Sequence, residues 1–207
     1  LFIHGNADAV NNTSADTYKS LMISLRQDYE SYLHSLTDDG DQSLKMFVQQ
    51  FSNATVQAGA AGADVNLVIG NAQYEICRDN EEFILTGTQY ARPYVDKDHL
   101  SSNGYRTDGE IAGVSIAQFL NTGSVLALRP DDANITQTST EVVIPLLGGV
   151  GNAVIDTVRV SDPGNYGFRL VGATITGVTI DAGRTIRIAK TGTATAVNYA
   201  YVGNRAN

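Results

Sequence analysis

The sequence is poor in cysteine, histidine and tryptophan, with one, three and none of them among 207 residues. The single cysteine, Cys77, excludes an intramolecular disulfide, and a packed thiol is expected because this residue falls in a segment of helical periodicity. The scattered histidines and the cysteine do not form a ligand set. We therefore predict no structural or catalytic transition-metal site and no cofactor.

Basic residues and long apolar runs are also scarce. The chain has 14 lysines and arginines against 22 aspartates and glutamates, which gives a net charge of -8. Binding to a phosphate backbone requires clustered positive charge, so a nucleic-acid partner is not expected. No run approaches the ~18 apolar residues of a membrane helix, and no membrane partner is expected. A neutral, sugar-like ligand suits this charge balance better.

The first part of the chain alternates between strand and helix patterns. In chain order, the predicted segments are a strand at residues 1 to 3, a helix at 13 to 36, a strand at 44 to 51, a helix that starts at the N-cap Asp64, a strand at 83 to 86 and a helix around 111 to 120. Because apolar residues open the chain, we expect further residues upstream. The alternation predicts an α/β layered domain with a parallel sheet, in which the loops after residues 3 and 86 open at one edge.

The second part of the chain loses the helical periodicity. Short runs rich in Val, Ile and Thr alternate there with Gly, Asp and Pro. Strands are predicted near residues 125 to 128, 141 to 147, 153 to 160, 166 to 171, 174 to 180, 185 to 189 and 194 to 202. We expect an all-β sandwich at residues 122 to 207, after the α/β domain at residues 1 to 121. A β-solenoid is the less favoured alternative, because no fixed period persists beyond about two turns.

The most informative motif is an Asp-x-x-His sequence formed by Asp96 and His99, which is followed by Leu100 and by Gly104-Tyr105. Two residues three apart in a turn can direct their side chains to one point, where an imidazole can exchange a proton at neutral pH. The alternative interpretation is a solvated charged turn that caps the next helix.

This stretch resembles the last conserved block of SGNH/GDSL hydrolases. The resemblance implies that His99 is the general base that activates a serine, and that Asp96 orients and stabilises its imidazole. It extends over residues 1 to about 121, as the C-terminal half of such a domain. It implies a three-layer, flavodoxin-like α/β fold with a parallel sheet, truncated at its N-terminus.

A second block, Ile-His-Gly-Asn-Ala-Asp-Ala at residues 3 to 9, is similar to the loop that completes the oxyanion hole in carbohydrate esterases of this family. Gly5 permits close approach and Asn6 offers an amide donor, so the resemblance makes both candidate oxyanion-hole residues. The family spacing would put the amide at position 7, where this chain has Ala7. His4 stands where the carbohydrate esterases have glutamine, and a structural role is the alternative for it.

The nucleophilic serine of the family is missing from this chain. In the family it lies in a Gly-x-Ser motif upstream of the block at Gly5, and no serine here has that setting. Ser14, Ser101 and Ser102 are better explained as helix caps. We expect at most trace hydrolytic activity from the chain alone, with the serine supplied by a neighbouring segment or another chain.

The segment at residues 197 to 205 contains Tyr-Ala-Tyr and resembles the ends of bacterial and phage carbohydrate esterases. The resemblance implies a hydrolase that is part of a serine esterase or deacetylase acting on acylated, in particular O-acetylated, polysaccharide. It implies an extracellular or virion-tail setting, such as a viral tailspike or tail fibre, and a homotrimer. The alternative is a non-catalytic glycan-binding or structural module of a tail or surface protein.

Overall fold

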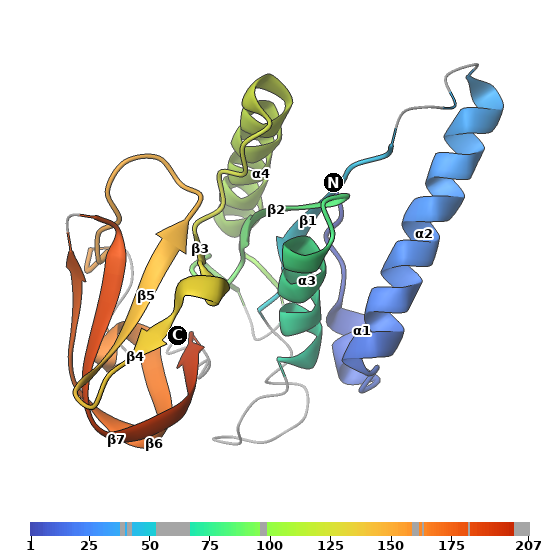
Figure 1. Ribbon diagram of the computed structural model, residues 1–207. Helices are drawn as coiled ribbons and strands as arrows, with labels where there is room; N and C mark the ends of the chain where they lie inside the picture. Colours follow the sequence, from blue (N-terminus) through green and yellow to red (C-terminus); the bar gives the residue numbers. More distant parts are fainter. Residues whose placement is uncertain are drawn as a thin grey trace. The chain divides into compact units, whose positions relative to one another are not determined.

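The computed structural model describes residues 1–37, 40, 43–52, 67–95, 99–158, 162, 164–181 and 183–200. The chain divides into two compact units, Leu1–Val125 and Leu126–Asn207. Figure 1 labels the helices and strands of both units in chain order. The fold mixes helices with two sheets, of which one is small and parallel and the other has five antiparallel strands.

The sheet of the first unit is parallel. Strand β1 (Met46–Gln50) pairs with β2 (Phe83–Thr88), and Phe2 forms a parallel bridge to Val48 on the other side of β1. The backbone of Phe2 makes two hydrogen bonds to β1, of 2.6 and 3.2 Å. Three chain segments therefore run in the same direction, so their carboxyl ends meet at one edge of the sheet.

The described residues of this unit contain four helices, which are α1 (Asn6–Val10), α2 (Ala15–Leu36), α3 (Val68–Asp79) and α4 (Ser102–Thr122). Met46 and Val48 share a buried core with residues of α2 and α3. Phe47, which points to the opposite face, meets Phe119 of α4 edge to face at 5.6 Å. Helices thus cover both faces of the sheet, which explains why the β1 run is apolar on both sides (Figure 1).

The predicted helix at residues 13 to 36 is confirmed, but its predicted apolar face is only partly buried. Ser14 caps α2 by accepting a hydrogen bond from the Thr17 amide at 3.2 Å, and Tyr18 and Met22 are buried. Three later members of the stripe are exposed, namely Tyr29, Leu33 and Leu36, and Leu21 in the first half of the helix is exposed as well. A helix of 22 residues is about 33 Å long. A strand of five residues is only about 17 Å long, so the second half of α2 passes beyond the sheet.

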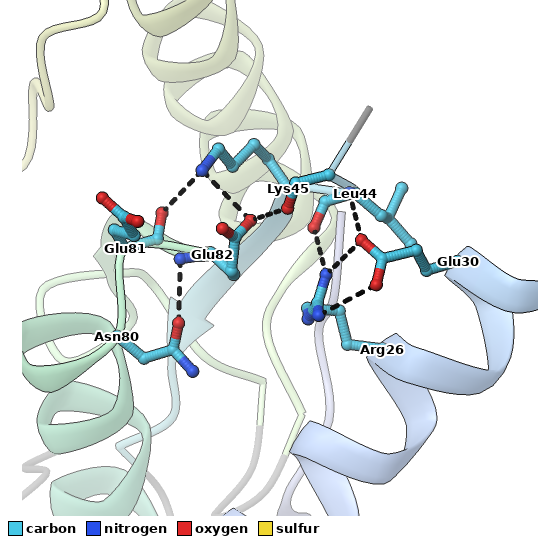
Figure 2. Close-up of polar contacts among 8 residues, drawn as sticks. Arg26, Glu30, Leu44, Lys45, Asn80, Glu81 and Glu82 are labelled. Atoms are coloured by element: carbon cyan, nitrogen blue, oxygen red, sulfur yellow. Dashed lines mark hydrogen bonds and ion pairs between the residues drawn. The ribbon is translucent and has the colours of Figure 1, made fainter. Parts of the chain in front are cut away.

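Polar contacts hold this second half of α2 to the start of β1 (Figure 2). Arg26 donates from Nη1 to Oε1 of Glu30 at 2.8 Å and to the Leu44 carbonyl at 3.1 Å. The Leu44 amide donates back to Glu30 Oε1 at 2.9 Å. These hydrogen bonds, above all the one from Arg26, lower the pKa of Glu30 to about 2. The ion pair of Arg26 and Glu30 thus lies where the periodicity of the helix predicts apolar contacts.

The two later helices begin at different kinds of cap. Helix α3 starts after Leu67, whose side chain makes no capping hydrogen bond. The predicted cap, Asp64, lies outside the described residues. Helix α4 is capped by Ser101, whose Oγ accepts from the Gly104 amide at 3.0 Å, while Ser102 is the first helical residue. None of the described helices has the length and apolar character needed to cross a membrane.

The second unit contains five strands among its described residues, in the order β3-β5-β7-β6 with β4 beside β5. Their bounds are Arg129–Pro130 for β3, Thr136–Gln137 for β4, Glu141–Leu147 for β5, Phe168–Asp181 for β6 and Thr185–Tyr199 for β7. Two 3-10 turns accompany them, at Asp132–Asn134 and Asn165–Gly167. The predicted strand at residues 141 to 147 is confirmed as β5.

The other strand predictions for this unit need correction. Residues 125 to 128 and 153 to 158 form no strand. The four predicted strands between residues 166 and 202 are two long strands, β6 and β7, which stay paired across bulges near Gly172 and Gly177. Bulges bend a strand without ending it, so the break predicted between residues 171 and 174, at Gly172, is a bulge inside β6.

The bent hairpin of β6 and β7 wraps one core. Leu170 pairs with Val197 near the open end of the hairpin, yet it is buried in the same cluster as Ile188 and Val142. The described strands of this unit therefore enclose their core with a single curved sheet. The two-sheet sandwich stays a prediction, because no second facing sheet occurs among the residues described.

Candidate functional site

A cavity of about 260 Å³ opens at the carboxyl ends of the three parallel segments. Ile3 and His4 line it directly after the Phe2 bridge, and Gln49 and Phe51 line it at the end of β1. Gln89 lines it just after β2. Ligands of open α/β sheets bind at this edge, outside the strand ends, so the cavity is the candidate functional site.

The cavity also brings together the two blocks that the sequence singles out. Asn6 from the first block lines it, as do Leu100 and Tyr105 from the second block. Gly104 allows α4 to approach, because a Cβ on this residue would lie 2.3 Å from the Pro93 carbonyl oxygen. Residues separated by more than 90 positions thus share one wall, as the predicted convergence of loops requires.

His99 is exposed and directly precedes Leu100, which lines the cavity, but His99 itself is not among the lining residues. Its carbonyl accepts a hydrogen bond from the Val95 amide at 3.0 Å, and Tyr94 bridges to Leu100 in antiparallel fashion. These contacts hold Val95 and His99 next to Tyr94 and Leu100, which line the cavity. Asp96 lies outside the described residues, so the predicted pairing of Asp96 with His99 stays a prediction.

The block at residues 3 to 9 runs into a short helix at Asn6, where we expect a loop. Gly5 precedes α1 with a φ of 133°, which favours glycine, and a Cβ there would lie 2.9 Å from Cγ2 of Ile69. Gly5 is buried and does not line the cavity, whereas Asn6 is exposed and does. Of the two candidate oxyanion-hole residues, the structure thus brings Asn6 to the cavity and uses Gly5 for close packing.

The buried amide of Gln73 holds two of the segments that line the cavity. Gln73 donates to the His4 carbonyl at 2.6 Å and to the Tyr18 hydroxyl at 2.9 Å, and it accepts from the Phe51 amide at 2.7 Å. Burial raises the pKa of Tyr18 to about 12, so the phenol stays protonated at neutral pH. The network joins α3 to the backbone on which His4 and Phe51 sit.

The His4 imidazole belongs to a separate set of contacts. Its Nδ1 lies 3.4 Å from Oδ2 of Asp8, one turn further along the chain, and Asp8 also accepts from the Thr13 hydroxyl at 3.1 Å. The ring packs between Phe2 and Tyr18, with centroid distances of 5.3 and 6.4 Å. These contacts orient His4 at the cavity wall and support the structural role that the sequence leaves open.

Asp108 of α4 does not line the cavity, but it contacts Gln49 and Gln89, which do. It is 2% exposed and forms an ion pair with Arg92, whose Nε lies 3.0 Å from its Oδ1. Gln89 donates to its Oδ2 at 3.1 Å, and Gln49 donates to its Oδ1. Three donors therefore satisfy one buried carboxylate, as a charge in such a place requires.

The Gln49 amide is left half satisfied by this arrangement. The side chain is 1% exposed, its Nε2 donates to Asp108, and its Oε1 is buried without a hydrogen-bond partner among the described residues. Turning the amide over would set Oε1 against a carboxylate, so the assignment of the two atoms is fixed by Asp108. An acceptor without a partner remains on a side chain that lines the cavity.

Sequence reasoning does not single out Gln49, Gln89 or Asp108. The available signal was the polarity of Gln49 at the end of an otherwise apolar strand, because a buried amide requires partners. Asp108 gives no such signal, since acidic residues are common on helix surfaces. Its role appears only when α4 is packed against the sheet.

Among the described residues, no group of three His, Cys, Asp or Glu side chains gathers closely enough to hold a metal ion. Comparisons with protein-family models, with curated proteins and with solved structures found no match for this chain. The resemblance to SGNH/GDSL hydrolases therefore depends on the residues of the two blocks alone, and membership of that family stays a prediction.

Proposed function

We propose that this chain is part of a serine esterase or deacetylase that acts on O-acylated carbohydrate. The proposal includes an SGNH-like three-layer domain at residues 1 to 121 and an accessory β-sandwich at residues 122 to 207. The observation that carries it is the convergence of both family-like blocks on one cavity at the carboxyl ends of parallel strands. Such strand ends are where α/β enzymes bind their ligands.

The roles of the residues follow from their chemistry. His99 acts as the general base, and Asp96 holds its imidazole in the reactive tautomer. Asn6, at the cavity wall, donates its amide to the oxyanion that forms when the ester carbonyl is attacked. The attacking serine comes from a polypeptide segment outside this chain.

The proposed substrate is neutral and rich in hydroxyl groups. The chain carries a net charge of -8, and the cavity offers amides and tyrosines rather than a cluster of cations. Acylated polysaccharide on a cell surface fits these properties. A place in an extracellular or virion-tail protein, with trimeric assembly, belongs to the same proposal and depends on the family resemblance alone.

A non-catalytic glycan-binding module is the second candidate. One observation favours it, because no serine, threonine or cysteine is among the described residues that line the cavity. A binding module would use the same amides and aromatic rings without a nucleophile. The two candidates differ in whether His99 contributes to turnover.

The test is acetate release from an O-acetylated polysaccharide by the purified chain, with wild type compared with His99→Ala. We expect trace turnover above the buffer rate, because a general base can activate water in place of serine, and we expect His99→Ala to fall to the buffer rate. His34→Ala, which changes a histidine of α2, is the matched control and should match wild type. Equal turnover in wild type and His99→Ala, with sugar binding retained, would favour the binding module.

A further inference from the structure

An exposed apolar patch lies on the second half of α2, away from the cavity. We call it the α2 patch, and its members are Tyr29, Tyr32, Leu33 and Leu36, which are 54%, 62%, 43% and 64% exposed. Their spacing of i, i+3, i+4 and i+7 puts them on one face of the helix. The same face is buried earlier in the helix, where Met22 belongs to the core. Figure 1 shows the end of α2 that carries the patch at the upper right, away from the strands and from α3.

The α2 patch carries no formal charge. The only Asp, Glu, Lys or Arg between residues 29 and 36 is Glu30, which pairs with Arg26 at 2.8 Å. A charged partner therefore finds no opposite charge on this face. Exposed apolar surface gathered in this way is typical of a contact with another apolar surface.

The order of residues in the patch makes it complementary to itself. When two copies of α2 cross antiparallel about a two-fold axis between residues 32 and 33, Tyr29 lies opposite Leu36 of the second copy. Tyr32 then lies opposite Leu33 of the second copy. Each contact occurs twice, as a two-fold interface requires, and each joins an aromatic ring to an aliphatic side chain.

The charges beside the patch favour the antiparallel over the parallel arrangement. A parallel pair would set Asp28 against Asp28 of the second copy, and like charges repel. In the antiparallel pair Asp28 lies opposite Thr37, and Glu30 lies opposite Ser35. Antiparallel helices also bring opposite ends of their dipoles together.

The area of the patch is enough for a weak dimer. Four side chains that are each about half exposed offer roughly 100 Å² apiece, or about 800 Å² over two copies. The polar residues at the rim bring the total near the ~1,000 Å² that a specific interface should exceed. Interfaces of this size are reversible, so the dimer should depend on protein concentration.

We propose that the α2 patch is a self-association surface, through which α2 of one copy packs antiparallel against α2 of a second copy. This inference does not depend on the proposed function. Trimeric assembly, which belongs to that proposal, requires a different contact. If both contacts form, two trimers join through α2 into a hexamer.

Sedimentation velocity of the full chain, from about 1 µM to about 1 mM, tests the proposal. Wild type should pass from monomer to dimer, or from trimer to hexamer, as the concentration rises. Tyr32→Lys puts two like charges at the two-fold axis and should raise the dissociation constant at least about tenfold. Leu36→Lys, at the edge of the patch, should weaken association as well.

Leu120→Lys is the matched control, because Leu120 is 72% exposed on α4 and lies outside the patch. It should associate like wild type, and circular dichroism should show the same helix content in all variants. Wild type that is monomeric or trimeric at every concentration overturns the proposal. Association that persists unchanged in both folded patch variants also overturns it, because the contact then lies elsewhere.

The orientation of the helices is measured separately, with spin labels at the exposed Ser24 in a Cys77→Ala background. In the antiparallel pair the two Ser24 backbones lie about 25 to 30 Å apart, since 17 residues of helix separate their levels. In a parallel pair they lie only about 10 Å apart. A short distance in the dimer would overturn the antiparallel contact.

Discussion

Asp108 in the first unit and Lys190 in the second are both buried charges, but their partners differ in kind. Asp108 is held by side chains, namely Gln49, Gln89 and Arg92. Lys190 is 4% exposed and donates from Nζ to backbone carbonyls, at 2.8 Å to Gly192, 3.0 Å to Thr138 and 3.4 Å to Ser139.

Only the centre at Asp108 adjoins the candidate site, because two of its partners, Gln49 and Gln89, line the cavity. A carbonyl that accepts from Lys190 has no second polar atom to satisfy, so the contact closes the turn between β4 and β5. An amide that donates to Asp108 always keeps an acceptor, and for Gln49 this acceptor is on a residue that lines the cavity. The choice of partner thus decides whether a buried charge leaves a further polar atom to be satisfied.

Removal of the Asp108 carboxylate should have the largest effect. Asp108→Ala leaves the Arg92 guanidinium and two amide groups without their buried acceptor, and we expect a loss of about 3 to 5 kcal/mol in the free energy of unfolding. Urea unfolding of the full chain measures the loss in free energy, and hydrogen exchange shows whether the loss lies in the first unit. Asp16→Ala, whose side chain is 97% exposed, is the control and should change stability by less than about 1 kcal/mol. Similar losses in both variants would contradict a buried Asp108 carboxylate that accepts from Gln49, Gln89 and Arg92.

Replacement of Lys190 should cost less and should leave ligand binding intact. Lys190→Met keeps most of the chain length but leaves three carbonyls without their donor, so we expect a loss of about 1 to 3 kcal/mol, confined to the second unit. Arg187→Met on the same strand breaks two exposed ion pairs, with Glu141 and with Asp181, and should cost about 0 to 1 kcal/mol. A change in sugar affinity in Lys190→Met would contradict the prediction that only the surroundings of Asp108 affect ligand binding.

Two glycines of α4 test how closely this helix, which carries Asp108, packs against the rest of the first unit. Gly104→Ala places a Cβ 2.3 Å from the Pro93 carbonyl oxygen, so the helix must shift, and we expect a loss of about 1 to 3 kcal/mol with weaker sugar binding. Gly113→Ala meets no atom within 4 Å and should stabilise the helix by about 1 kcal/mol. Thermal unfolding of both variants measures the opposite signs. Stabilisation by Gly104→Ala would show that α4 does not pack this closely.

The smallest effect concerns acid stability. The pKa of Glu30 is lowered to about 2 by Arg26, so its contribution is present above the unfolded carboxyl pKa of ~4.3 and is lost as the pH falls toward 2. Glu30→Gln should be less stable than wild type at pH 7, and the difference should shrink toward pH 2. Unfolding curves at pH 7, 4 and 2 measure the difference. A constant difference at every pH would contradict a charged Glu30 in the folded protein.

Local patterns predicted most of the elements of the first unit, for physical reasons. The strand at residues 83 to 86 lies within β2, and α2 begins at the Ser14 cap, because apolar runs and capping side chains act over a few residues. The exposure of Leu33 could not be predicted from the periodicity of its helix. It depends on how far the sheet extends beneath α2, which is a property of the tertiary structure.

The second unit was predicted less well because its strands continue where the sequence indicates turns. Gly172 has a φ of +81° and sits at a bulge, so it bends β6 without breaking the pairing with β7. The site shows the same division. A short motif drew attention to Asn6, which lines the cavity, whereas the contact of Gln49 with Asp108 joins residues 59 positions apart and requires the packed helix.

An NMR titration of the full chain with an O-acetylated methyl glucoside tests directly whether the cavity at the carboxyl ends of the parallel segments is the ligand site. We expect saturable chemical-shift changes at Asn6, Gln49 and His99, and none along β6 and β7. Changes confined to the second unit, or no saturable change at any cavity residue, would contradict it.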